Sequence, residues 1–171
     1  MIANIATTGR KLFFPNSHLW LRARKELLQA ARLSWLVDVG LTQRKLDDIG
    51  DVSSVNTLVP QERVNRDCFV QAGQNIMEIQ WDGLTISGAD ELYHTVYETY
   101  EESTLIQSPL SGMVLKVNTL DPDREELDED TILLQMRVDT DSLNLATKNL
   151  VQEGEYNDFV RTLPRGRFQD S

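Results

Sequence analysis

The sequence has 171 residues, of which 40% are hydrophobic and 26% charged, a composition that suits one globular domain with a substantial core. Its formal net charge of −10 argues against nucleic acid as the main partner, because phosphate binding depends on Lys and Arg, and favours a basic partner surface. No apolar run approaches the ~20 residues that a membrane helix needs. With Cys68 as the only cysteine and His18 and His94 as the only histidines, we expect neither an internal disulfide nor a metal site.

The N-terminal region is basic and contains no acidic residue. The cations within residues 1–25 are Arg10, Lys11, Arg22, Arg24 and Lys25. Acid-free segments with serine and threonine are typical of organellar targeting sequences, and a basic surface strand is the equal alternative. We therefore interpret residues 1–11 as a basic extension or targeting remnant. The expected location is the matrix side of the mitochondrion, with a plastid as the alternative.

Short strands are expected at the start of the domain. Residues 12–14 (LFF) followed by residues 15–17 (PNS) indicate a strand and a turn. His18 is expected to be a packed or surface histidine without a functional role. Residues 25–33 have the spacing of a short helix, and longer flanking strands explain them equally well. Residues 35–40 are again typical of a strand.

A short helix is expected within residues 41–51. Thr42 can cap its start, and Leu46 and Ile49 share one face. Gly50 stands where a left-handed residue commonly ends a helix.

Residues 56–75 are interpreted as an inserted loop because they combine Pro60, Gly73 and mixed charges. Cys68 and its neighbours Phe69 and Val70 are expected to hold this loop to the core. A lone free cysteine is usually a small buried hydrophobic residue, so we expect no redox role for it.

Residues 76–81 alternate between apolar and polar, which predicts a strand. Asp82 and Gly83 then predict a tight hairpin turn into a strand at residues 84–86. Residues 88–90 (GAD) predict a further turn.

The most informative stretch is residues 93–117. Residues 93–100 are rich in β-branched and aromatic residues, which favour a strand. We expect a polar hairpin tip at residues 101–103 and then a second strand. A bend at residues 108–112 (SPLSG) follows, and residues 113–117 have a short strand pattern.

The C-terminal third begins with an acidic segment. Residues 121–130 hold seven acidic residues and one arginine, and we interpret them as a solvated acidic loop, with contact to a basic partner as the alternative. Residues 132–138 predict a closing core strand. Residues 150–160 carry an apolar stripe that would dock on the sheet, with Gly154 interrupting the helix, and residues 164–171 form a basic tail.

Several of these motifs together resemble the H-protein of the glycine cleavage system, an aminomethyl carrier related to lipoyl and biotinyl domains. Residues 98–101 occupy the place of its hairpin motif, and the SPLSG bend follows at the expected distance. The spacing from Val39 to Asp51 and the pattern of residues 150–160 also match, and residues 18–22 (HLWLR) are similar to one of its strands. The residues that carry the central resemblance are Glu98, Thr99, Tyr100, Glu101, Ser108, Pro109, Ser111 and Gly112.

The resemblance implies a mainly β fold with flanking α, namely a barrel-sandwich hybrid with short helices and a C-terminal helical segment over residues 12–163. In its register, Glu101 stands where the family carries its lipoyl-lysine, and no lysine occurs between Lys45 and Lys116. Because lipoate is attached through an amide to an amine, a carboxylate cannot hold it. We therefore expect no cofactor. Residues 121–130 also differ from the family, which has there a loop that helps to shape the cleft for the loaded arm.

No catalytic constellation emerges from the sequence, and we expect the chain not to be an enzyme. The favoured hypothesis is a non-lipoylated, structural or regulatory interaction subunit of an organellar assembly, with protein partners and without nucleic acid or a membrane span. The alternatives are a glycine cleavage H-protein after all, or a factor in lipoate or glycine metabolism.

Overall fold

The computed structural model describes residues 10–27, 33–89, 95–119, 121 and 126–164. It is mainly β, with two antiparallel sheets and a few short flanking helices, which confirms the expected class. Residues 1–9 of the proposed extension or targeting remnant (residues 1–11) and most of the basic tail lie outside the described residues. None of the described helices is long and apolar enough to span a membrane.

The larger sheet has six strands in the order β1-β2-β3-β9-β8-β5. β1 and β8 agree with the expected strands, and β2 and β3 show that longer strands, not a helix, account for the described part of residues 25–33. The bounds are Leu12–Phe14 for β1, Leu19–Leu27 for β2, Leu33–Leu41 for β3, Phe69–Val70 for β5, Gly112–Val117 for β8 and Leu134–Val138 for β9.

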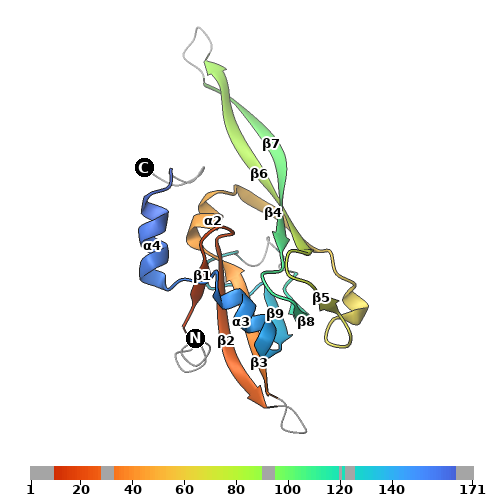
Figure 1. Ribbon diagram of the computed structural model, residues 1–171. Helices are drawn as coiled ribbons and strands as arrows, with labels where there is room; N and C mark the ends of the chain where they lie inside the picture. The colour runs from red at the N-terminus through yellow and green to blue at the C-terminus, as the bar shows by residue number, and fades with distance from the viewer. Residues whose placement is uncertain (1–9, 28–32, 90–94, 120, 122–125, 165–171) are drawn as a thin grey trace.

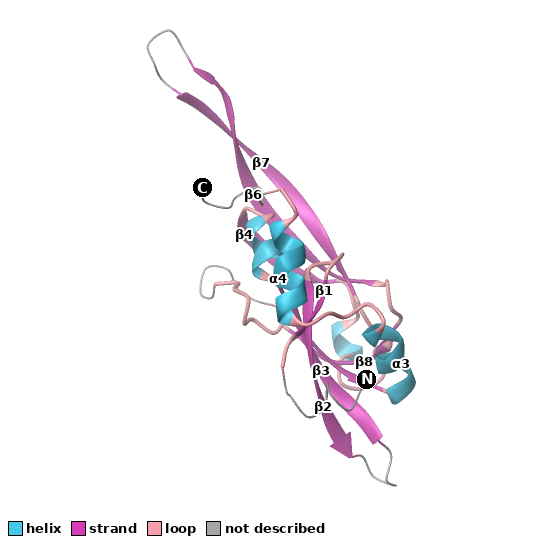
Figure 2. Ribbon diagram, turned by 60° about the vertical axis from the view of Figure 1, so that its left-hand side comes forward, coloured by secondary structure: helices cyan, strands magenta, loops and turns pink. Residues whose placement is uncertain are grey.

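The smaller sheet contains β4 (Asp51–Thr57), β6 (Asn75–Ala89) and β7 (Thr95–Gln107), with β6 in the centre. β4 pairs with β6 only as far as Asp82, so residues 83–89 pair with residues 95–100 alone. These two segments, called the arm below, project as a twisted two-stranded ribbon at the end of the molecule opposite β2 and β3 (Figures 1 and 2).

One hydrophobic core joins the two sheets. Its cluster combines Leu21, Val37 and Met136 of the larger sheet with Ile79 and Trp81 of the smaller one, all buried. Burial of each such side chain stabilises the fold by about 1.5–3 kcal/mol, so this core holds the two sheets together.

Among the described residues, three α-helices and one 3-10 turn flank the sheets: α2 (Gln43–Asp47), η2 (Gln61–Arg63), α3 (Thr140–Thr147) and α4 (Glu153–Arg161). The expected cap of α2 is confirmed, because the Thr42 hydroxyl accepts from the Lys45 N–H at 3.3 Å. α3 lies against β3 and α4 beside β1 (Figure 1). α3 was not predicted, although Asp139 caps it by accepting from the Ser142 N–H at 2.7 Å.

The structure corrects the expected glycines at the helix ends. Gly154 lies within α4 and does not interrupt it. Gly50 is not left-handed, since Gly73 is the described glycine with positive φ. A Cβ on Gly50 would lie 2.1 Å from the Asp82 carbonyl oxygen, so glycine is required there by the close approach of β6.

The structure also contradicts the turns expected before and after the arm. Residues 82–83 and 84–86 belong to the continuous strand β6, so the tight turn at Asp82 and Gly83 is wrong. Residues 101–103 lie inside the continuous strand β7, so the hairpin tip expected there is wrong as well. Gly88 and Ala89 are still in β6, and the remainder of that expected turn falls outside the described residues.

Candidate functional site

The sequence-predicted site residues divide between the root of the arm and the bend below it. Glu98, Thr99, Tyr100 and Glu101 are consecutive residues of β7, and Ser108, Pro109, Ser111 and Gly112 follow its end. Glu101 is exposed and pairs with Asp82, between the Trp81–Glu102 pair and the Gly83–Tyr100 pair.

An acidic row crosses the smaller sheet at this level. Asp51 pairs with Asp82, and Asp82 pairs with Glu101, so three exposed carboxylates stand side by side on adjacent strands. Residues directly opposite in antiparallel strands share a face, and like charges at such positions destabilise the sheet. None of the three forms an ion pair with a described residue. Their arrangement is unfavourable for stability and suited to attracting a cationic surface.

The acidic character extends through the whole smaller sheet. β4, β6 and β7 contain no lysine, arginine or histidine. Their acidic residues are Asp51, Glu78, Asp82, Glu98, Glu101 and Glu102. An exposed sheet with charges of one sign produces a field that draws oppositely charged partners and repels similar ones.

An aromatic contact braces the root of the arm. The rings of Trp81 and Tyr100 meet edge to face with centroids 6.1 Å apart, and the Trp81 indole N–H donates to Thr104 Oγ1 at 3.0 Å. Tyr100 also lies over Gly83, where an added Cβ would come within 2.1 Å of its ring. Gly83 therefore leaves the space that the Tyr100 ring occupies, and it is not a turn residue.

The bend at residues 108–112 is held in place by hydrogen bonds and close packing. The buried Ser108 hydroxyl donates to the Leu110 carbonyl at 2.6 Å, and the Ala72 N–H donates to Ser111 Oγ at 2.9 Å. A Cβ on Gly112 would lie 2.7 Å from the Arg137 carbonyl oxygen of β9. These contacts fix the bend against the segment predicted as an inserted loop, which itself supplies η2 and β5.

Cys68 is buried at 4% exposure, and burial raises the pKa of its thiol above the usual 9.0. The expected burial is thus confirmed, as it is for Val70, whereas Phe69 is 65% exposed on the edge strand β5. Within the described part of the chain, no group of three His, Cys, Asp or Glu residues could hold a metal ion.

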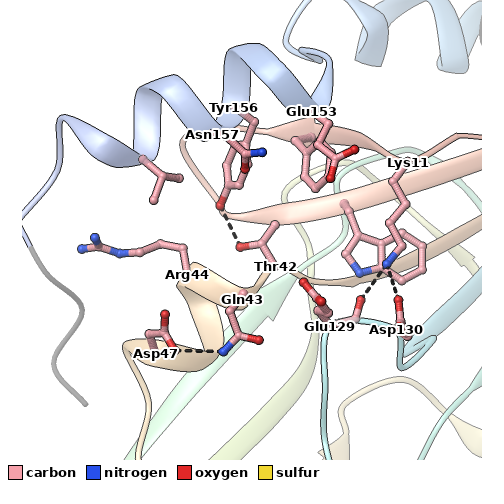
Figure 3. Close-up of a pocket in the computed structure, with 13 residues that line it drawn as sticks. Lys11, Thr42, Gln43, Arg44, Asp47, Glu129, Asp130, Glu153, Tyr156 and Asn157 are labelled. Atoms are coloured by element: carbon pink, nitrogen blue, oxygen red, sulfur yellow. Dashed lines mark hydrogen bonds and ion pairs between the residues drawn. The ribbon is translucent and has the colours of Figure 1, made fainter. Parts of the chain in front are cut away.

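Sequence reasoning missed a second site, a pocket of about 380 Å³ under α4. Figure 3 shows Glu153, Tyr156 and Asn157 of α4 above it, and Gln43 and Glu129 on the facing side. The remaining lining residues are Lys11, Phe13, Trp20, Thr42, Arg44, Asp47, Asp130 and Val160.

A series of hydrogen bonds holds α4 in place over this pocket. The Tyr156 hydroxyl donates to Thr42 Oγ1 at 2.8 Å and lies 2.8 Å from His18 Nδ1, while its ring stacks on Phe13 with centroids 4.8 Å apart. Burial lowers the pKa of His18 below 6.5 and raises the pKa of Tyr156 above 10.0. His18 therefore packs against α4, and its burial favours the neutral imidazole. Thr42 and Tyr156 are 114 positions apart in the chain, so no local sequence pattern indicates this contact.

Comparison with known proteins identifies no relative. No protein-family model, no curated protein and no solved structure matches this chain. The acidic sheet with its arm, and the pocket under α4, are therefore the features from which a function can be argued.

Proposed function

We propose that this chain is a non-enzymatic, non-lipoylated interaction module that docks through the acidic face of its smaller sheet onto a basic surface of a protein partner. The observation that carries the proposal is the row of Asp51, Asp82 and Glu101 in a sheet without any cation. A row that costs stability and lacks an internal counter-charge is explained by a partner that supplies the counter-charge.

In this proposal the fold is a barrel-sandwich hybrid similar to that of lipoyl and biotinyl domains, and the chain is a divergent relative of the H-protein. The support is the sequence resemblance, together with a mainly β architecture in which two sheets share one core. The basic, acid-free N-terminal residues favour a mitochondrial matrix assembly, with a plastid as the alternative.

The second candidate, an aminomethyl carrier, rests on the SPLSG bend that follows β7. It requires an amine for lipoate, and residues 46–115, which include the whole arm, contain no lysine. The intact mass of the protein from its native source decides between the two. A lipoyl-sized addition would establish the carrier, and an unmodified mass leaves the interaction module. The same spectrum shows whether residues preceding Lys11 have been removed.

The docking proposal is tested by neutralising the acidic row in the tagged protein and sizing it in extracts of its native organelle. The variant is Asp51→Asn, Asp82→Asn and Glu101→Gln. The matched control, Asp141→Asn, Asp158→Asn and Glu155→Gln, removes the same charges from exposed positions on α3 and α4.

We expect the wild type and the control to elute with a large assembly, and the acidic-row variant to elute as the free 19.5 kDa chain. High salt should also release the wild type, because the screening length shrinks from ~8 Å at physiological ionic strength to ~3 Å at 1 M. Elution of the wild type as a free chain, or equal retention of both variants, contradicts the proposal.

A further inference from the structure

The pocket under α4 has an unbalanced set of charges. Lys11 Nζ is held by the Glu129 carbonyl at 2.9 Å and by Asp130 Oδ1 at 2.8 Å. Arg44 is likewise engaged, with Asp48 at 3.2 Å and with the Pro164 carbonyl. Both cations that line the pocket are therefore already paired.

The carboxylates of Glu129 and Glu153 have no such partner. Neither side chain forms a hydrogen bond or an ion pair with a described residue, and the two lie on opposite walls of the pocket (Figure 3). The uncompensated charge of the pocket is negative, so a cationic group is the complementary ligand.

A buried N–H donor without a hydrogen-bond partner in the same pocket indicates a second chemical feature of the ligand. Trp20 lines the pocket and is 1% exposed, and its indole nitrogen is the one buried side-chain nitrogen or oxygen of the described residues without a hydrogen-bond partner. By contrast, the indole N–H groups of Trp35 and Trp81 donate to Thr140 and Thr104. An indole nitrogen only donates, so the pocket lacks an acceptor oxygen for this donor as well as a counter-charge for Glu129 and Glu153.

We propose that this pocket binds the free N-terminus of a polypeptide. The carboxylates of Glu129 and Glu153 attract its α-ammonium group. The carbonyl oxygen of the same first residue accepts a hydrogen bond from the Trp20 indole N–H. A lysine side chain carries the ammonium without a neighbouring acceptor, and a free amino acid adds a carboxylate that this negative pocket disfavours. The indole nitrogen is covered, so we expect the Lys11 side chain, whose Nζ lies 4.4 Å from the ring centroid, to move aside.

This inference rests on the proposed function only in taking a protein as the partner. No residue of β4, β6 or β7 lines the pocket, so the two sites are separable by mutation. Loss of docking in the acidic-row variant together with unchanged pocket binding, or the reverse, identifies which proposal fails.

The test follows the three indole N–H signals of the ¹⁵N-labelled full chain by NMR during titration with small probes. Glycylglycinamide carries the free N-terminus, N-acetyl-glycylglycinamide lacks it, Nα-acetyl-lysine methylamide offers only a side-chain ammonium, and glycine is the free amino acid. We expect glycylglycinamide to shift the Trp20 signal saturably while the signals of Trp35 and Trp81 stay in place. The acetylated peptide should have no effect, and glycine and the lysine probe should bind more weakly.

Variants test the role of the carboxylates. Glu129→Gln with Glu153→Gln should weaken glycylglycinamide about tenfold, since charge-assisted hydrogen bonds are worth roughly that factor in affinity. Glu155→Gln, an exposed residue of α4 outside the pocket lining, and the acidic-row variant should bind as the wild type does. A Trp20 signal that does not move, or that responds equally to the acetylated peptide, overturns the proposal. A stronger response to glycine or to the lysine probe also overturns it, in favour of an amino-acid or basic side-chain site.

Discussion

Replacing Tyr156 with phenylalanine isolates the hydroxyl that holds α4 to the body of the molecule. Tyr156 is the one described residue of α4 that is buried, and its hydroxyl meets Thr42 Oγ1 and His18 Nδ1, each at 2.8 Å. The substitution keeps the stacking on Phe13 and leaves two partly or fully buried polar groups without this partner. An orphaned buried group costs ~1–3 kcal/mol, so we expect a loss of about 2 kcal/mol in the free energy of unfolding. For a chain of this length, that corresponds to a fall in Tm of roughly 4–8 °C.

The assay is urea unfolding of Tyr156→Phe, Thr42→Val and the double variant, with amide hydrogen exchange of residues 153–161 measured in parallel. Thr42→Val alone should cost about 1 kcal/mol for the lost cap of α2, in addition to the lost contact with Tyr156. The double variant should be less damaged than the sum of the singles by about 1 kcal/mol, because both remove the same hydrogen bond. Two results together would refute this prediction: losses in the free energy of unfolding that add fully in the double variant, and unchanged amide hydrogen exchange in α4. They would show that the hydrogen bonds of the Tyr156 hydroxyl do not hold the helix in place.

Three further outcomes are expected. Burial holds the pKa of folded His18 below 6.5, so the unfolded chain takes up the proton first, and the free energy of unfolding should fall as the pH drops from about 7.5 to 5.5. His18→Asn, which tolerates the φ of 56° at this position, should remove this part of the pH dependence of urea unfolding. Gly112→Ala should lower the free energy of unfolding by about 1–3 kcal/mol, because the new Cβ clashes with the Arg137 carbonyl. Gly154→Ala places its Cβ with no atom within 4 Å, so it should be neutral or stabilise the protein by up to ~1 kcal/mol. Equal effects of the two substitutions in thermal melts would contradict the roles given to these glycines. Asp82→Lys should raise the free energy of unfolding by about 0.5–1 kcal/mol by replacing the central charge of the acidic row with its opposite, and a decrease would show that the row is not repulsive.

Local sequence patterns predicted the elements whose causes are local. Thr42 caps α2 because its hydroxyl reaches an N–H three residues away, and that geometry depends on nothing distant. The alternation of residues 76–81 likewise records which face of β6 meets the core. Gly83 shows the limit of such patterns. Asp-Gly is typical of a tight turn, yet the glycine serves a ring 17 positions later in the chain, in a contact that only the pairing of β6 with β7 creates.

The length of the arm was the main feature that the sequence obscured. The polar run of residues 101–103 predicts a hairpin tip because charged residues are common in turns. In the structure these residues are exposed within β7, where a strand tolerates charges without turning. The pocket under α4 was equally out of reach, since β1, α2, the turn at Glu129 and α4 contribute to it from across the sequence.

The uncovered strand edges of the smaller sheet determine how this sheet could pair with another chain. β7 is an edge strand, and β6 also has an open edge beyond Asp82, so both offer unpaired backbone groups to an extended chain. A second copy pairing through its own smaller sheet would bring the six acidic residues of β4, β6 and β7, strands without lysine, arginine or histidine, against the same set, and the repulsion would oppose the pairing. A basic strand would meet no such barrier. The charge that leaves the sheet less stable therefore also opposes pairing between identical copies at this edge and favours a chain of opposite charge.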